Sequence, residues 1–336
     1  MQRQNPPQGR IRLSDVARMA GVSTSTVSRV LSNPDLVAET TREAVAQAVQ
    51  ASGYRMNRAA QNLRMGRTGA VVALVPNLGN PFFAKILEGM GRELAAAGYD
   101  LLVADTLDRA SLGTTLQRFL DPSRADGIIL LDGRASPAQL APAPELPPVV
   151  LACEWVEGTA LPCVMLDNHM GGGLAVAHLR DLGHCHIGII GGPPANVLHQ
   201  ARLAGAQAAA GDARLTLFEG DFSLHAGQAA AKSWLALPAA DRPGAVFAFS
   251  DEMACAFIAD LMRAGLDVPG EVSVMGFDDI ELASHLMPAL TTIRQPKRDL
   301  GRKAAQVVLA AIAGRPVAPV TRLEPRLMPR DSTAAA

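Results

Sequence analysis

Residues 11–31 read IRLSDVARMAGVSTSTVSRVL, and this stretch decides the fold of the N-terminal part. Leu13, Val16, Ala17 and Ala20 recur at the spacing of one helix face. Gly21 follows them and can adopt the positive φ that ends a helix. The sequence therefore predicts a short helix followed by a tight turn.

A second helix is expected after Ser23, whose hydroxyl can cap it. Its buried side is formed by Val27, Val30 and Leu31. Its other side carries Thr24, Ser25, Ser28 and Arg29. Short polar side chains allow close approach to the major groove, where Arg can bond guanine through two N–H groups. We favour a DNA-reading helix over the alternative, an ordinary pair of helices with one solvated face.

Two further helical segments follow this pair. A third helix is predicted from Thr40 to Ser52, with Thr40 and Glu43 in the spacing of a capping box and Gly53 at its end. Residues 57–64 form a helix-capable octet with one large apolar residue, Leu63. Isolated helices below about 12–15 residues are marginal in water, so we expect this octet to fold only against a partner.

The charge of the chain is divided unevenly. Residues 1–66 hold nine Arg, no Lys and four acidic residues, which gives +5. The remaining 22 basic and 28 acidic residues give −6. A small basic part attached to a larger acidic part suggests a module that binds a polyanion.

From residue 70 onward the pattern changes to buried strands separated by helices. Because such strands are apolar on both faces, they indicate parallel, doubly wound sheets, and their number indicates two α/β lobes. Ligands of these sheets bind beyond the carboxyl ends of the strands. The predicted strands are 70–75, 99–104, 126–131, 148–153, 186–191, 214–218, 244–249 and 271–276, and the helix after the first strand carries Phe83, Ile86, Leu87, Met90 and Leu94 on one face.

Several classes of function are disfavoured. The four cysteines form no C-x-x-C pair, so a disulfide scaffold or structural zinc site is not expected. His184-Cys185-His186 looks like a set of metal ligands, but side chains alternate along a strand and no fourth ligand is suitably spaced, so a structural role is favoured over metal binding. No nucleophile or acid–base constellation indicates an enzyme. The N-terminus has no apolar signal segment and no run is long enough to span a membrane, so we expect a cytoplasmic protein.

The ordered motifs DVARMAGVSTSTVSRVLSNPDLV, LGHCHIGIIGGP, RLAG, FSDEMA, VSVMGFDD and LTTIRQP resemble the lactose/galactose repressor (LacI/GalR) family from Ile11 to about Arg330. The resemblance implies a small all-α helix-turn-helix head and an α/β core of two doubly wound parallel-sheet lobes, similar to periplasmic sugar-binding proteins. The expected organisation is a disordered arm (1–10), the DNA-binding domain (11–56), a hinge (57–67) and the core (68–336), with the first lobe at 68–167 and 296–316 and the second at 168–293 and 317–331.

The resemblance also implies roles for individual residues. The base-reading positions are Thr24, Ser25, Ser28 and Arg29, and the hinge residues that approach the minor groove are Asn57, Ala60, Leu63 and Arg64. Leu63 is the residue expected to wedge between base pairs and kink the operator.

Effector-binding positions are implied in the core: Phe82, Phe83, Asn196, Arg202, Phe222, Ser250, Asp278 and Gln295. For Phe82 and Phe83, packing in the core is an equal alternative. Arg202 has an interlobe salt bridge as its alternative, and as an effector contact it favours a sugar acid or phosphate. Replacing Arg202 by alanine is then expected to abolish the effector response and leave folding intact. One acid of the Asp278–Asp279 pair is expected to be structural.

The predicted function is a transcriptional regulator, most simply a repressor of a carbohydrate operon. Its partners are operator DNA, a sugar-like effector and a second copy of the chain, with no cofactor, metal or membrane. The runner-up classes are a pure solute-binding protein and a two-lobed enzyme. The sequence leaves open the effector, the operator, whether the effector induces or corepresses, activation at some promoters, and how the short 206–218 segment affects the pocket.

Overall fold

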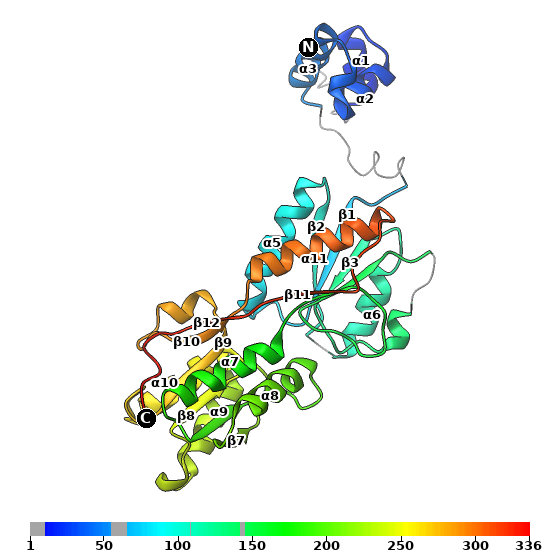
Figure 1. Ribbon diagram of the computed structural model, residues 1–336. Coiled ribbons are helices and arrows are strands. Elements are labelled where there is room, and N and C mark those ends of the chain that lie inside the picture. Colours follow the sequence, from blue (N-terminus) through cyan, green and yellow to red (C-terminus); the bar gives the residue numbers. More distant parts are fainter. Residues whose placement is uncertain (1–10, 55–65, 108, 142–144) are drawn as a thin grey trace, which may run out of the picture. The chain divides into compact units, whose positions relative to one another are not determined.

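The computed structural model describes residues 11–54, 66–107, 109–141 and 145–336 (Figure 1). The chain divides into two compact units, Met1–Gly66 and Arg67–Ala336, each with its own hydrophobic core. Among the described residues, no helix has the length and apolar character needed to cross a membrane.

The head contains α1 (Leu13–Ala20), α2 (Thr24–Ser32), the short 3-10 helix η1 (Pro34–Leu36) and α3 (Glu39–Ser52). Val16, Val27 and Val45 come from the three α-helices and are fully buried against one another. Gly21 ends α1 with a φ of 67°, as predicted, and the hydroxyl of Ser23 accepts a 3.1 Å bond from the Thr26 amide to cap α2.

The start of α3 differs from the prediction. The helix begins at Glu39 rather than Thr40, with Ala38 as its N-cap residue and no side-chain cap bond. The carbonyl of Ala38 accepts the amides of both Thr41 and Arg42, so the helical bonds already start there. The predicted capping box of Thr40 and Glu43 is therefore wrong.

The first lobe is built on a six-stranded, all-parallel sheet in the order β11-β5-β4-β3-β1-β2. Alternate residues of β1 point to opposite faces, as the period of a strand requires. Val71 and Ala73 pack under α5 (Phe82–Ala96) and α11 (Lys297–Ile312), whereas Val72 and Leu74 pack under α6 (Arg109–Phe119). The strands are β1 (Ala70–Val75), β2 (Asp100–Asp105), β3 (Gly127–Leu130), β4 (Val149–Ala152), β5 (Cys163–Leu166) and β11 (Val320–Leu323), with η2 (Pro137–Leu140) after β3.

The second lobe has a six-stranded sheet in the order β12-β10-β9-β8-β6-β7, in which only the pairing of β12 is antiparallel. Phe277 of β9 faces α7, and its neighbour Gly276 faces α10, so the helix pairs α7–α8 and α9–α10 cover opposite faces. The elements are α7 (Asn168–Asp181), β6 (His186–Ile190), α8 (Val197–Ala209), β7 (Arg214–Phe218), α9 (Leu224–Ala236), η3 (Ala239–Asp241), β8 (Ala245–Ala248), α10 (Asp251–Arg263), β9 (Ser273–Asp278), η4 (Glu281–Ser284), β10 (Thr291–Arg294) and β12 (Arg326–Met328).

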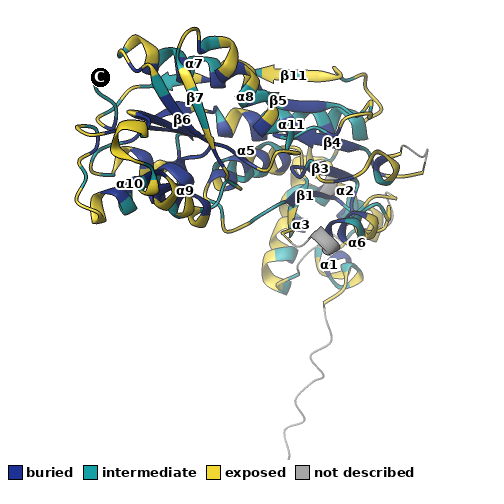
Figure 2. Cartoon of the chain, turned by 90° about the horizontal axis from the view of Figure 1, so that it is seen from below, coloured by how far each residue is buried: buried dark blue, intermediate teal, exposed yellow. Residues whose placement is uncertain are grey.

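The predicted fold class is confirmed, and Figure 2 shows the inner strands of both sheets as buried. One boundary is wrong. Residues 317–323, assigned to the second lobe from the sequence, include β11, which pairs with β5 of the first. The chain therefore returns to the second lobe only after Leu323. Within the described core it crosses between the lobes near Asp167, at Gln295–Pro296 and between Leu323 and Arg326.

Candidate functional site

The outer face of α2 carries the predicted base-reading side chains. Thr24, Ser25 and Arg29 are exposed, and Ser28 is partly buried. The opposite side of α2 is tied to the head by the buried Val27 and Val30. The helix therefore offers short hydroxyl side chains and one guanidinium to an approaching groove. The predicted hinge residues Asn57, Ala60, Leu63 and Arg64 lie outside the described residues.

Strained backbone marks the ends of strands in the core. Among the described residues, four that are not glycine have a positive φ: Cys153 (68°), Phe222 (69°), Asp278 (121°) and Asp279 (53°). Cys153 directly follows β4, Phe222 follows β7 after a short loop, and Asp278 ends β9. Such conformations cost about 1–3 kcal/mol each and cluster at binding and catalytic sites. They place the candidate effector site at the carboxyl ends of the strands of both lobes.

Arg202 is the buried cation of this site. Its Nε donates to Oδ1 of Asn168 at 2.9 Å, and its Nη1 donates to the carbonyl of Phe249. The guanidinium lies 3.7 Å from the ring centroid of Phe277 and 5.9 Å from that of Phe222. Burial lowers its pKa to about 10, against the opposing attraction of Asp278 and then Glu154.

Gly172 of α7 positions Arg202. A Cβ at Gly172 would collide with the main-chain carbonyl of Arg202, so its absence allows α8 to lie close against α7. Arg202 is thereby held against its partner Asn168, which is the first residue of α7.

Asp278 is the buried acid that faces Arg202. Only 7% of it is exposed, and Oδ1 accepts a 2.7 Å bond from Nε2 of Gln295. Burial raises the pKa of Asp278 to about 6, although Arg202, Lys297 and the Gln295 bond all favour its ionised form. Lys297, in the first turn of α11, donates to the main-chain carbonyls of Asp278 and Asp279. Asp278 therefore lies in one buried cluster with Gln295, which donates to it, and with Arg202, whose charge acts on it.

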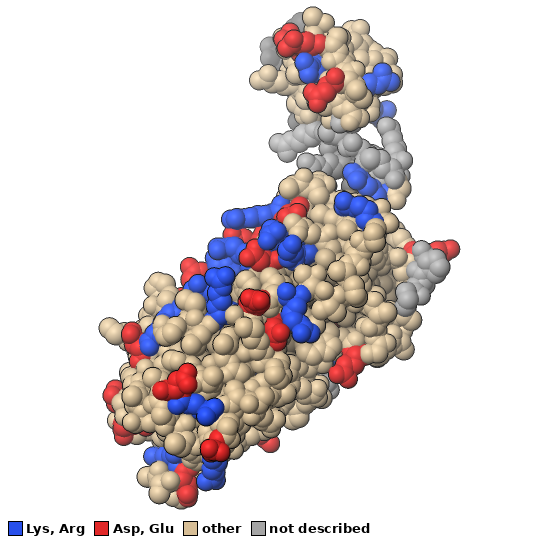
Figure 3. Space-filling view, in the orientation of Figure 1, with Lys and Arg blue, Asp and Glu red and all other residues tan. Residues whose placement is uncertain are grey.

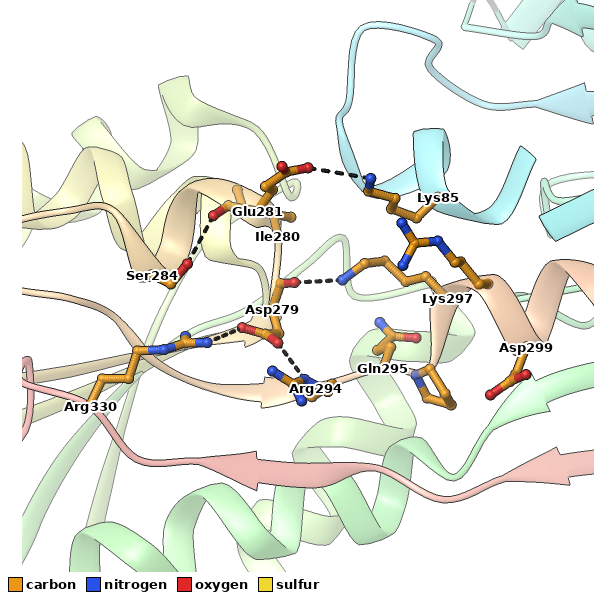
Figure 4. A pocket seen from close by; sticks show the side chains of 12 residues that line it. Lys85, Asp279, Ile280, Glu281, Ser284, Arg294, Gln295, Lys297, Asp299 and Arg330 are labelled. Atoms are coloured by element: carbon orange, nitrogen blue, oxygen red, sulfur yellow. Dashed lines mark hydrogen bonds and ion pairs between the residues drawn. The ribbon is translucent and has the colours of Figure 1, made fainter. Parts of the chain in front are cut away.

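Asp279 is the structural member of the acid pair. Its carboxylate accepts from Arg294 at 2.5 Å and from Arg330 at 2.6 Å (Figure 4). These bonds lower its pKa despite partial burial. The side chain consequently joins three segments of the second lobe.

Glu154 and Asn196 connect the two lobes. Asn196 caps α8 through Oδ1, which accepts the amides of Leu198 and His199, while its Nδ2 donates to Oε1 of Glu154 at 3.0 Å. The other oxygen of Glu154 accepts from the amide of Gly133 at 2.7 Å. Burial raises the pKa of Glu154 against these two bonds.

Phe82 and Phe83 belong to the core of the first lobe. They are 8% and 9% exposed and meet edge to face with centroids 5.0 Å apart. Their neighbour Asn80 contacts the other lobe instead, through a 3.0 Å bond from Nδ2 to Glu252. The structure therefore favours core packing for both phenylalanines over ligand contact.

Phe222 and Ser250 lie together in the second lobe. The ring of Phe222 rests over Gly192, where no side chain could fit, and its carbonyl accepts from Oγ of Ser250 at 3.4 Å. That hydroxyl also accepts the amide of Met253 and caps α10. Ser250 is thus held by the protein itself, whereas the ring of Phe222 remains partly exposed.

A cavity of about 660 Å³ opens where the crossover segments meet both lobes (Figure 4). Of the predicted effector residues, Gln295 alone lines it, together with Lys85 of the first lobe and Asp279 and Glu281 of the second. Lys85 and Glu281 form an ion pair of 3.4 Å across it. Arg202 and Phe222 do not line this cavity, so it adjoins the buried cluster at Asp278 without containing it.

Known proteins share both parts of this architecture. Residues 12–57 match the model of bacterial regulatory proteins of the lacI family, and residues 176–333 match that of a periplasmic binding protein-like domain. The repressor CytR of Escherichia coli K12 is 35% identical over 330 residues, which cover 96% of each chain. The chain belongs to the LacI family of bacterial transcriptional regulators. It is a DNA-binding regulator, as the sequence predicts.

Other relatives extend this comparison. The repressor PurR of Photobacterium profundum is 35% identical over 309 residues, covering 89% of this chain and 91% of that protein. The lac repressor dimer bound to operator and the anti-inducer ONPF superposes with a TM-score of 0.84 at 27% identity, covering 97% of this regulator and all of that chain. The regulator CelR in complex with cellobiose gives 0.69 at 32% identity, covering 96% and 100%.

Three polar residues of the site were missed from the sequence: Glu154, Asn168 and Lys297. Glu154 follows a strand, and Asn168 and Lys297 lie at helix starts, Lys297 directly after the LTTIRQP motif, but nothing in the sequence pairs them with Asn196, Arg202 or Asp278. Their partners are 42, 34 and 19 residues away along the chain. An acid directly after the apolar run PVVLAC was the one available signal, and it points to the strand end that Glu154 follows.

Proposed function

We propose that this regulator is a homodimeric repressor whose affinity for its operator is set by a sugar or sugar derivative bound between the two lobes. The observation that carries this proposal is the meeting of both lobes at one buried polar cluster. Glu154 of the first lobe bonds Asn196 of the second, beside Arg202 and Asp278. A ligand there contacts both lobes, so its binding free energy depends on their relative orientation, and this difference shifts a conformational equilibrium.

The relatives support the effector and the DNA target. The lac repressor structure holds both an operator and an anti-inducer, and CelR holds cellobiose. The exposed face of α2 supplies groups that read base edges. On the face of the core drawn in Figure 3, acidic and basic side chains are interspersed. This face is therefore not the uniformly positive surface that attracts a polyanion.

The edge of the first lobe supports a dimer. Within the described residues, strand β2 is the edge of its sheet and pairs with β1, and its Leu102 and Val103 are both 41% exposed. Exposed apolar side chains on a sheet edge are a ready surface for a second chain. We propose that β2 and the adjoining α5 form part of the dimer interface. Light scattering is expected to give twice the chain mass, and a monomer or tetramer at micromolar concentration would contradict this.

We further propose that the regulator acts in the cytoplasm and is not an enzyme. The candidate effector site between the lobes is called the cleft below. Its polar groups bond one another: Arg202 bonds Asn168, and Asp278 bonds Gln295. This arrangement binds and orients a ligand.

Operator retention tests the proposed function. The full chain is applied to DNA carrying a site selected from random sequence, in parallel with residues 67–336, which form a compact unit of their own. Only the full chain is expected to be retained, with affinity that falls steeply as salt increases. Equal retention of the core alone would overturn the assignment of DNA binding to the head.

A further inference from the structure

We propose that the cleft selects a ligand rich in hydrogen-bond donors and free of anionic groups, such as a neutral sugar, an amino sugar or a nucleoside. Sugar acids and sugar phosphates are rejected. This inference rests on the proposed function, because it concerns the same cleft. It also reverses the preference for an anionic ligand that Arg202 suggests when only the sequence is known.

The guanidinium of Arg202 is engaged by the protein itself. An arginine clamps a carboxylate or phosphate by offering two parallel N–H groups. Nε already donates to Asn168, so it is not free to act together with Nη2 on an anion. Nη1 already donates to the carbonyl of Phe249. One face of the guanidinium is against Phe277, and only 3% of the residue is exposed. Arg202 therefore holds the second lobe together, and two of its three guanidinium nitrogens already donate to the protein.

Lys297 is engaged in a similar way. Its ammonium donates to the carbonyls of both Asp278 and Asp279, and the residue is 8% exposed. An ammonium has three N–H donors, so two of them are already used by the main chain. Neither buried cation of the cluster is arranged to receive an anionic ligand.

The carboxylates have acceptor capacity to spare. An ionised carboxylate offers about four lone-pair positions. Asp278 accepts at Oδ1 from Gln295, and each oxygen of Glu154 accepts one bond, from Asn196 or Gly133. Glu252, which accepts from Asn80 across the lobes, is close enough to Asp278 for that charge to raise its pKa, after the larger effect of burial. Hydroxyl or amine groups of a ligand satisfy these oxygens directly.

The charged groups of the cleft also disfavour an anionic ligand. Three carboxyl groups, those of Glu154, Glu252 and Asp278, share the site with two cations, Arg202 and Lys297, and burial raises the pKa of all three acids. An entering anion adds negative charge to a poorly solvated site that already disfavours the ionised form of these acids, and burying an unpaired charge there is costly. The partly exposed ring of Phe222 offers an apolar surface to a sugar ring or a base.

Matched pairs of ligands test the inference. Thermal shift and calorimetric titration of the full chain use ribose against ribose 5-phosphate, adenosine against its 5′-monophosphate, and glucose and glucosamine against gluconate and glucose 6-phosphate. For at least one pair, the uncharged or amino member is expected to bind about tenfold or more tightly than its anionic partner, a difference of about 1.4 kcal/mol. Anionic members that bind as tightly or more tightly would overturn the inference, as would no binding by any neutral or amino member at about 10 mM.

A charge variant separates the cleft from the rest of the surface. Glu154→Gln keeps an acceptor for the Gly133 amide and removes the negative charge, so the discrimination against the anionic member is expected to shrink severalfold. Glu157→Gln, three residues on and exposed, is the matched control and keeps the full discrimination. Equal discrimination in wild type and Glu154→Gln would contradict the claim that the charge of Glu154 disfavours anionic ligands. If binding follows the prediction but operator affinity ignores the ligand, the proposed function fails and the inference stands.

Discussion

Nδ2 of Asn196 donates to Oε1 of Glu154 at 3.0 Å, and this bond joins the cap of helix α8 in the second lobe to the end of strand β4 in the first. The two residues are 42 positions apart in the chain. Because the bond lies beside Arg202 and Asp278, any change in the angle between the lobes alters the surroundings of the effector. Asn196 therefore has two separable roles, a cap within one lobe and a contact with the other.

These roles can be separated by substitution. Asn196→Asp keeps an oxygen that caps α8 and replaces the amide by a carboxylate facing Glu154, so repulsion should favour the open arrangement of the lobes. Small-angle scattering is expected to show a larger radius of gyration for the isolated core, residues 67–336. Asn196→Ser, which keeps the cap and adds no charge, should change it less. The same radius in all three proteins would show that the bond does not hold the lobes together.

The burial of Arg202 changes what its removal should do. Arg202→Ala leaves Asn168 and the carbonyl of Phe249 without this donor and removes a buried positive charge that acts on Asp278 and Glu154. The free energy of unfolding is expected to fall by roughly 3 kcal/mol or more. The expectation from the sequence, that folding stays intact, is thereby revised. Chemical denaturation measures the change, and the exposed Arg214→Ala serves as control, with a change within about 0.5 kcal/mol.

Asp278 makes stability depend on pH. Burial raises its pKa to about 6 in the folded protein, against about 3.9 in an unfolded chain. The folded state therefore holds this proton more tightly, so the contribution of Asp278 to the free energy of unfolding falls as pH rises from about 4 to 6 and is constant above that range. Arg202 on α8, Lys297 on α11, Gln295 and Asp251 on α10 set this value.

Between about pH 4 and pH 6, the melting temperature of Asp278→Asn should therefore fall less with rising pH than that of the wild type. Asp251, whose pKa is also raised by burial, keeps the remainder. The exposed Asp212→Asn is expected to retain the slope of the wild type. A slope in Asp278→Asn as steep as that of the wild type would show that Asp278 ionises normally in the folded protein.

Arg29 is the side chain on which base recognition should depend most. Arg29→Ala is expected to weaken binding to a selected operator by about 1–3 kcal/mol and to relax the preference at one base position. Binding to random DNA should change little by comparison. Arg18→Ala is a suitable control, since that exposed arginine on α1 pairs with Asp15 at 2.6 Å. Unchanged operator binding in Arg29→Ala would show that α2 does not read the bases.

The periodic parts of the fold could be predicted from the sequence, and the short edge elements could not. Strands such as Ala70–Val75 are buried on both faces and read as continuous apolar runs. Strand Val320–Leu323 lies at a sheet edge, alternates exposed and partly buried residues, and carries Thr321 and Arg322, so no apolar run announces it. Its pairing with Cys163–Leu166 depends on the tertiary fold.

For the site, the sequence predicts which residues take part but not which partners they bond. Motifs placed Arg202, Asp278 and Phe222 near one another, but their chemistry depends on partners that no spacing reveals. Asn168 and Phe249 accept bonds from two nitrogens of Arg202, so a residue expected to bind an anion is a buried cation that holds the lobe together. Phe82 and Phe83 face the core because α5 packs on β1 through the same side that carries Ile86 and Met90.

The most direct test of the account is the affinity of the full chain for a labelled, selected operator, measured by fluorescence anisotropy with and without the best-binding neutral or amino ligand of the matched pairs. The account predicts that the dissociation constant for operator changes about fivefold or more when that ligand saturates the protein. The anionic partner at the same concentration should leave it unchanged. An operator affinity that is the same with and without the bound ligand would contradict the account, because the cleft would then not be coupled to DNA binding.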